Sequence, residues 1–189
     1  MLGRTVAQKL AEDFKQPFVA ENRPGAGGVI GSELVAKALP DGYTLLVSGV
    51  ASHAVAPALP AGTPYDPLRD FTHIALFGGP PAVLVVGPSL AAHDLHELIA
   101  LAKARPGALS YGSPGNGTHG HLVGELLKQL AGIQMQHVPY RGAAVAVADL
   151  IAGHIPLAST TLSTAAGQIH AGRARGLAVS TAARPRCWW

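Results

Sequence analysis

Short apolar runs alternate with longer amphipathic segments along most of this chain, and this alternation restricts the folds it can adopt. Strands that alternate with helices of about ten or more residues form βαβ units, in which helices cover both faces of a mainly parallel sheet. The pattern therefore predicts an α/β protein. The expected strands are 17–21, 43–47, 72–77, 82–86, 109–112, 134–138, 154–158 and 177–180, and the expected helices are 2–14, 29–39, 93–104, 118–131, 142–152 and 162–171.

An uncharged stretch of 19 residues, 74–92, marks the boundary between two predicted lobes. The stretch is long enough to cross a bilayer as a helix, but three prolines and a Gly-Gly pair would break such a helix. We therefore predict two strands joined by a bend, where the chain passes between lobes without an intervening helix. The predicted domains are a first α/β lobe at 1–78, a second at 79–180 and an atypical tail at 181–189.

Both ends of the chain have the features of a truncation. The first expected helix begins at Leu2 with no capping residue before it, and the opening residues lack the charged start and apolar stretch of an export signal. At the other end, the single cysteine and both tryptophans fall in the last three residues, Cys187 to Trp189. We expect this composition to mark an artificial or out-of-frame tail.

Charge and composition exclude several classes of protein. Apolar residues make up 48% of the chain, which excludes intrinsic disorder. Charged residues are only 13%, the formal net charge is +3, and no two Lys or Arg residues are adjacent, so no nucleic-acid-binding surface is expected. One cysteine cannot form an internal disulfide, and it does not distinguish an oxidising compartment from a reducing one.

The most informative loop, GSPGNGTHG at 112–120, lies between an expected strand and an expected helix. Its glycines allow the backbone to approach a ligand closely. The amides of Gly117, Thr118 and His119 would begin the helix, where unpaired N–H groups and the helix dipole favour an anion such as a carboxylate or a phosphate. The loop is therefore a candidate anion site, although a plain turn with Thr118 as the helix cap fits the same residues.

Other chemistries find less support in the sequence. Glycines at 115, 117 and 120 fit the GxGxxG pattern of dinucleotide-binding proteins, but the acidic residue expected about 20 positions later is absent. His119 and His121 would point in different directions on a helix, which argues against a metal site and favours solvated or capping histidines. No Ser/His/Asp set can be chosen from spacing, so no catalytic residue is predicted.

Further polar residues follow other expected strands, and ligands of α/β folds bind at the carboxyl ends of strands. Arg141 could face an anion or simply cover a strand end. The hydroxyl run at 159–161 could contact a ligand or only start a helix. Ser48, Ser52 and His53 follow a strand of the first lobe, and would face the same cleft or form an ordinary polar loop.

Four long motifs resemble one known protein family. They are ENRPGAGGVIGSELVAKALPDGYTLL at 21–46, PYDPLRDF at 64–71, LIALAKARPGALSYGSPGNGTHGHLVGELL at 98–127 and HVPYRG at 137–142. Together they closely resemble the Bug-type receptors of the tripartite tricarboxylate transporter family. The resemblance runs from about residue 2 to residue 184.

The resemblance implies a periplasmic solute receptor of the type II periplasmic-binding-protein architecture, with two α/β lobes that close on a small organic anion. It implies a binding protein without a cofactor rather than an enzyme. Family ligands are commonly di- or tricarboxylates, acidic amino acids or aromatic acids, which the receptor passes to membrane permease subunits. By position in the motifs, the expected ligand-binding residues are Ser48, Ser52, Ser113, Gly115, Asn116, Gly117, Thr118, Thr160 and Thr161.

The chain also departs from the family pattern. Family members begin with an export signal, a first strand and a GGxxD loop, whereas this sequence starts at positions that match the segment directly after that loop. The C-terminal return to the first lobe is missing too, so the first lobe is expected to be incomplete. Pro156 stands where the family usually has an acidic residue.

Three alternative functions stay open on the sequence alone. A truncated remnant without function is favoured by the ragged ends. The effector-sensing domain of a cytoplasmic regulator would have the same two-lobed fold, but a regulator carries a DNA-binding helix-turn-helix and none precedes Met1. A dinucleotide-dependent enzyme is the weakest alternative, because the acidic residue of its motif is missing.

Overall fold

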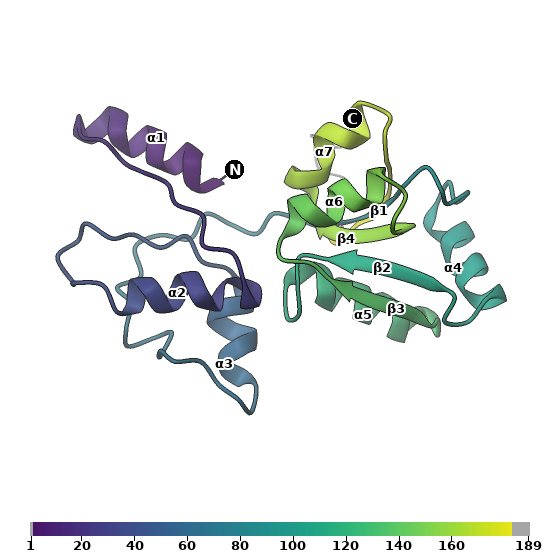
Figure 1. Ribbon diagram of the computed structural model, residues 1–189, viewed down its shortest axis with the longest axis horizontal. Coiled ribbons are helices and arrows are strands. Elements are labelled where there is room, and N and C mark those ends of the chain that lie inside the picture. Colours follow the sequence, from purple (N-terminus) through teal and green to yellow (C-terminus); the bar gives the residue numbers. More distant parts are fainter. Residues whose placement is uncertain (1, 183–189) are drawn as a thin grey trace.

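The sheet of this protein lies entirely in its second half. The computed structural model describes residues 2–182, and its single five-stranded sheet has the order β3-β2-β4-β1-β5 (Figure 1). The strands are β1 (Ala82–Val86), β2 (Leu109–Ser113), β3 (Met135–Pro139), β4 (Leu157–Thr161) and β5 (Arg175–Val179).

One strand runs against the other four. Strand β2 is parallel to both β3 and β4, whereas β1 is antiparallel to both of its neighbours, β4 and β5. Strand β1 is the first strand of the sheet, and the chain enters it directly from the first half without a helix. The sheet is therefore mixed, and the mainly parallel arrangement expected from the sequence holds for its other strands.

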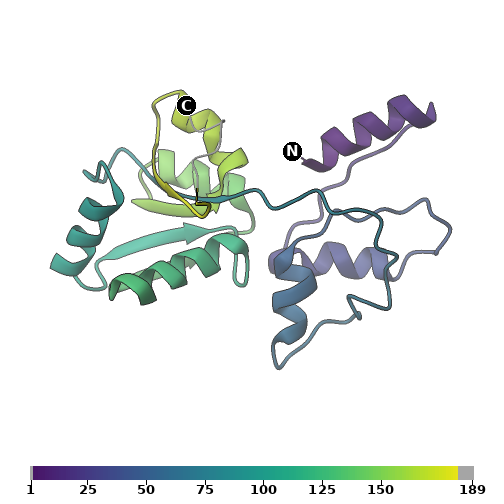
Figure 2. The same ribbon diagram turned by 180° about the vertical axis from the view of Figure 1, so that it is seen from behind.

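Helices cover both faces of the sheet, as the alternating pattern predicts (Figures 1 and 2). All five residues of β1 are buried. Side chains 83 and 85 join the core beneath α6 and α7, while side chains 84 and 86 join the core beneath α4 and α5. These helices are α4 (Leu95–Ala104), α5 (His119–Ala131), α6 (Ala143–Ile151) and α7 (Leu162–His170).

The structure shifts some predicted boundaries in this half. The strand expected at 154–158 is found at 157–161, because His154 still belongs to the turn that closes α6, where its N–H donates to the Asp149 carbonyl at 2.9 Å. Pro156 has no N–H to donate to a neighbouring strand. The helix expected from residue 93 begins at Leu95 instead, since the Asp94 carboxylate caps it by accepting the Glu97 N–H at 2.8 Å.

The first half contains helices but no strand among residues 2–81. The strands expected at 17–21, 43–47 and 72–77 are therefore wrong: these segments run without any partner strand. A strand needs inter-strand hydrogen bonds, and apolar periodicity alone cannot supply a neighbour. The elements of this half are α1 (Leu2–Phe14), η1 (Ala26–Gly28), α2 (Val29–Ala36), η2 (Ala51–Val55) and α3 (Ala56–Ala58).

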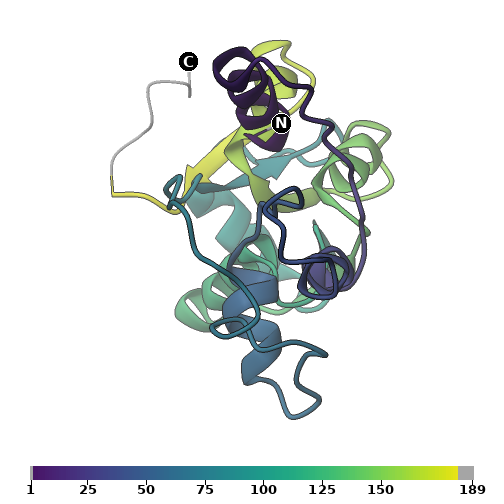
Figure 3. The same cartoon turned by 90° about the vertical axis from the view of Figure 1, so that its left-hand side faces the viewer.

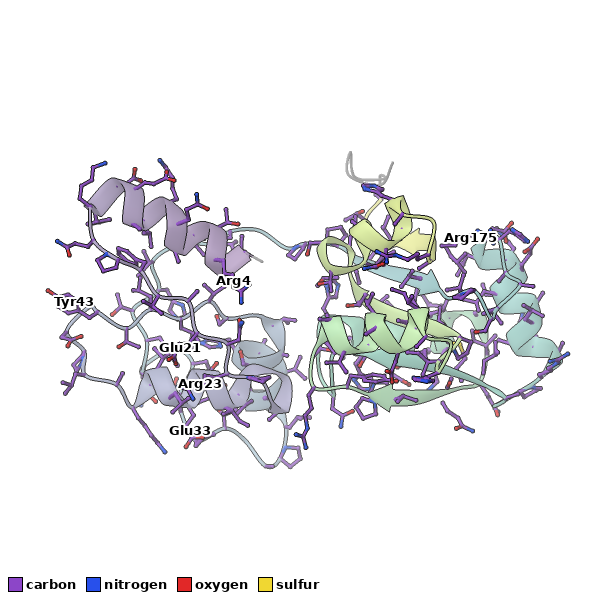
Figure 4. The ribbon with its side chains drawn as sticks, turned by 45° about the horizontal axis from the view of Figure 1, so that its top comes forward. Arg4, Glu21, Arg23, Glu33, Tyr43 and Arg175 are labelled. Atoms are coloured by element: carbon purple, nitrogen blue, oxygen red, sulfur yellow. The ribbon has the colours of Figure 1, made fainter. Side chains whose placement is uncertain are left out.

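The unpaired segments leave large apolar side chains in solvent. Val19 is 86% exposed, Tyr43 91% and Leu76 94%. Tyr43 points away from the rest of the molecule (Figure 4). Helix α1 lies apart from α2 and α3 in both Figure 1 and Figure 3. The first half is thus held by few buried residues, in contrast to the sheet and its helices.

Polar contacts outside the core are mostly local. Arg23 pairs with Glu21 at 2.7 Å in the segment before α2 (Figure 4). Arg175 is an exception, because its Nη1 donates to the Ala92 carbonyl at 3.3 Å and so ties β5 to the segment that precedes α4. Within the described residues, no helix has both the length and the apolar character needed to cross a membrane. Most of the predicted atypical tail, residues 183–189, lies outside the described residues.

Candidate functional site

The predicted anion-binding loop connects β2 to α5, at the carboxyl end of a strand flanked by two parallel neighbours. Ser113 is fully buried at the start of the loop. Its Oγ accepts the Gly115 N–H at 3.2 Å and lies 2.7 Å from Nε2 of His137 on β3. The loop therefore begins on a side chain that is fixed by two partners.

Thr118 caps α5. Its Oγ1 donates to the Gly115 carbonyl at 2.7 Å and accepts the His121 N–H at 3.4 Å. Gly115 and Gly117 have φ values of +134° and +73°, which other residues adopt only under strain. The capping interpretation of Thr118 is confirmed, and it is compatible with a binding role for the same loop.

Two of the amides expected to face an anion already have partners inside the loop. The Gly117 N–H donates to Nδ1 of His121 at 3.1 Å, and the Thr118 N–H donates to the Gly115 carbonyl at 3.3 Å. The expectation that both amides are available is therefore corrected. The interpretation of His121 as a capping residue is confirmed, because its ring accepts a backbone N–H of the turn that precedes its own helix.

The first half contacts this same loop. A methyl group placed on Gly27 would lie 3.2 Å from the Asn116 carbonyl oxygen, and one placed on Gly117 would lie 3.1 Å from Cγ1 of Val55. Both glycines have positive φ. The turn at 25–28 and the helix η2 therefore approach the loop as closely as glycine allows.

Ser52 lies next to this contact, whereas Ser48 is exposed. Ser52 is only 2% exposed, and a methyl group on Gly28 would lie 3.6 Å from its Oγ. Its Oγ lies 3.0 Å from Nδ1 of His53, and its carbonyl accepts the Tyr65 hydroxyl at 2.7 Å. The structure thus brings Ser52 close to the loop, and leaves Ser48 in solvent at the end of an unpaired segment.

The sequence analysis did not identify Tyr65, whose hydroxyl donates to the Ser52 carbonyl and so holds the backbone of Ser52 in place. Tyr65 is buried and packs edge-on against Phe71, with ring centroids 5.6 Å apart. The ring centroids of His53 and Phe71 are 4.9 Å apart. The pKa of His53 is lowered mainly by burial, and to a smaller extent by the nearby His73. Both aromatic residues belong to the PYDPLRDF motif, so the motif itself was the available signal.

The carboxyl end of β4 is polar and buried. Thr160 is fully buried, and its hydroxyl has no hydrogen-bond partner among the described residues. The same holds for Ser159, whose carbonyl oxygen packs directly against Gly120 of α5. Thr161 differs, because its Oγ1 lies 3.0 Å from Oγ1 of Thr164. Of the predicted pair, only Thr160 therefore has an unpartnered hydroxyl.

A pair of stacked histidines lies beneath the loop. The rings of His121 and His137 are 4.2 Å apart. Burial and then the neighbouring His121 lower the pKa of His137 to about 4. Tyr111 packs on the His137 ring and donates to the Glu125 carboxylate at 2.7 Å, and burial raises the pKa of this tyrosine. No sequence pattern indicated this pair, because its members are 16 residues apart on different elements.

Other candidate chemistries receive no partner groups from the structure. Arg141 is exposed. Across residues 2–182, no three His, Cys, Asp or Glu side chains gather as a metal-binding group. One hollow lies along α4 and another lies between α5 and β5, and residues 113–118 line neither of them. The arrangement at the loop is thus a contact between the two halves, with glycine turns, buried hydroxyls and neutral side chains.

The fold places the chain among the periplasmic binding proteins, and comparison with known proteins identifies its family. Residues 2–187 match the family model described as the tripartite tricarboxylate transporter family receptor. This chain belongs to that family. Protein BugT of Bordetella pertussis is 36% identical over 185 residues, which cover 97% of this chain and 57% of BugT.

Two solved structures share both fold and sequence with the chain. Rpa4515 of Rhodopseudomonas palustris, solved with adipate, is 38% identical with a TM-score of 0.94. MatC of the same organism, solved with bound malate, is 27% identical with a TM-score of 0.87. Each superposition covers 97% of this chain and 62% of the other. The chain spans a little over half the length of the curated relatives it matches.

Proposed function

We propose that this chain is the ligand-binding part of a periplasmic receptor that captures a small carboxylate for a tripartite tricarboxylate-type transporter. The observation that carries the proposal is the close contact between the first half of the chain and the loop 115–118 of the second half. A ligand bound at this contact would touch residues of both halves. Two similar structures hold adipate and malate, which are both dicarboxylates. The proposed role is binding and delivery to membrane permease subunits, without catalysis.

The proposed contacts come from three places around the loop. Ser52 and the turn at 25–28 would bind from the first half, while Thr118 and the start of α5 would bind from the second. The buried hydroxyl of Thr160 is an unused donor on the adjacent strand β4. A buried hydroxyl without a partner costs free energy, so a ligand oxygen or a water that reaches it would be favoured. The remaining proposed positions are Ser48, Ser113, Gly115, Asn116, Gly117 and Thr161.

Calorimetry against a panel of organic acids tests the proposal. We expect at least one mono- or dicarboxylate to bind, with adipate and malate as the first ligands to try. Neutral sugars, basic amino acids and nucleotides of similar size serve as controls. Binding of cations or nucleotides alone would contradict the carboxylate assignment.

Replacing Thr118 with valine should weaken carboxylate binding by about 1–3 kcal/mol, because it removes a half-buried hydroxyl at nearly constant volume. The hydroxyl holds the Gly115 carbonyl and caps α5, so stability should also fall by roughly 1 kcal/mol. Thr118→Ser is the matched control, since it keeps the hydroxyl and should retain most of the affinity. Equal affinities for Thr118→Val and the unmodified chain would place the ligand elsewhere.

A further inference from the structure

Two hydrogen bonds connect the stacked histidines to opposite ends of the binding loop. His137 reaches Ser113 at the start of the loop through Nε2, at 2.7 Å. His121 accepts the Gly117 N–H near the end of the loop through Nδ1, at 3.1 Å. With their rings stacked 4.2 Å apart, the two side chains act as one support beneath residues 113–117.

The bond to Gly117 requires His121 to be neutral. A backbone N–H is always a donor, so the ring nitrogen that it meets must carry a lone pair rather than a proton. In the imidazolium ion both ring nitrogens carry protons, and Nδ1 can no longer accept. Protonation of His121 therefore breaks the bond to Gly117 and leaves two N–H groups facing each other.

The surrounding charges compensate only in part for a proton on this pair, because Glu125 raises the pKa of His137 whereas Lys128 lowers it. From α5, Glu125 and Lys128 face the histidines, and Tyr111 faces them from β2. The Glu125 carboxylate is already occupied, because it accepts from Lys128 at 2.8 Å and from the Tyr111 hydroxyl at 2.7 Å. Stacking also places any charge on one ring directly against the other.

We propose that His121 and His137 are positioning residues that hold the ligand-binding loop in its binding conformation, and that they do so only while His121 is neutral, so that the affinity for carboxylates falls as the pH falls. The loop at 115–118 is where both halves of the molecule meet, so a local change at Gly117 reaches the contact with Val55 directly. The expected loss of carboxylate affinity rests on the proposed function, whereas the expected change in the conformation of the loop does not.

The two histidines contribute differently to the pH dependence. The pKa of His137 is about 4, well below its usual 6.5, so this ring stays neutral in the folded protein through mildly acidic pH. The unfolded chain takes up the same proton near pH 6.5, and stability therefore falls as the pH drops from about 6.5 towards 4. Protonation of His121, and not of His137, breaks the bond to Gly117, because the acceptor of that bond is Nδ1 of His121.

Nuclear magnetic resonance on the ligand-free chain tests the loop directly. The Gly117 amide and the imidazole nitrogens are followed from pH 7.5 to pH 5 in ¹⁵N-labelled protein. We expect the Gly117 amide to shift with the same midpoint as Nδ1 of His121. In His121→Asn, whose side-chain oxygen can accept the same bond but does not titrate, the amide should show no midpoint. His96→Asn, at an exposed histidine on α4, is the matched control and should titrate like the unmodified chain.

Adipate is the probe for the affinity arm, measured by calorimetry at pH 7.5 and pH 6. The unmodified chain should lose affinity on the order of fivefold or more between these values, which is a usual size for coupling between two sites. His121→Asn should show a clearly smaller ratio, and protonation of adipate itself affects both proteins equally. A Gly117 amide that does not move while His121 titrates, or a His121 ring that stays neutral to pH 5, overturns the inference. Absence of adipate binding bears only on the proposed function, because the resonance measurement decides the inference without ligand.

Discussion

Replacing Gly120 with alanine is expected to destabilise the protein by about 2–3 kcal/mol, as overpacking does in a close-packed core. Gly120 lies in the first turn of α5, and an added methyl group would collide with the carbonyl oxygen and carbon of Ser159. These atoms belong to the backbone of β4, which is bonded between β2 and β1 and cannot rotate aside. The clash must therefore move the helix or the strand.

A glycine in another helix supplies the matched control. Gly167 lies in α7 with nothing within 4 Å of the position that a methyl group would take. Alanine there should stabilise the chain by about 0.5–1 kcal/mol, because it removes the entropic cost of glycine in a helix. Urea unfolding followed by circular dichroism measures both variants. If Gly120→Ala and Gly167→Ala unfold at the same urea concentration, then α5 does not pack on β4 as described.

Much of the second half could be predicted because its signals are local. Thr118 is of a residue type that caps helices, and it caps the helix that follows it. Asp94 caps α4 in the same way, although the helix was expected to begin one residue before it. The five residues of β1 are apolar without interruption, which is typical of a strand buried on both faces, and all of them are buried. The family was also predictable, since the motifs that identify it are long and occur in order.

The direction of β1 and the first half could not be predicted in the same way. Apolar periodicity at 43–47 gives a segment the character of a strand, but pairing depends on what lies beside it in space. The structure provides no neighbouring strand for this segment among residues 2–182. Local patterns therefore identified a strand-like segment without establishing whether a sheet contains it.

The site was predictable in its residue types but not in its bonding. Positive φ at Gly115 and Gly117 agrees with the prediction of a tight glycine turn. The partners of that turn, however, come from His121 one helical turn later and from His137 on another strand. These contacts between distant positions arise from the packing of β2, β3 and α5, and this packing cannot be predicted from any single segment of the sequence.

Hydrogen exchange is expected to show strong protection in residues 82–179 and weak protection through most of residues 2–81. Amides of β1, β2 and β4 should exchange only through global unfolding, because these strands are central in the sheet and their side chains form both cores. Local opening in the first half should cost little, since its buried apolar residues are few and include Ala51 and Tyr65. The rates in the two halves should differ by several orders of magnitude, given opening free energies that run from about zero to the full 5–15 kcal/mol of a domain.

The same exposed segments should make the chain associate with itself. Extended backbone with unpaired N–H and C=O groups and apolar side chains is a template for pairing with another chain. Sedimentation at increasing concentration should detect this association, and replacing Val19 and Leu76 with serine should reduce it. Leu130→Ser is the matched control, because Leu130 is 78% exposed on α5, away from any unpaired segment, and its loss should change little. Uniform protection across both halves in a chain that stays monomeric would contradict the expectation, and would mean that segments 17–21, 43–47 and 72–77 find partners within one molecule.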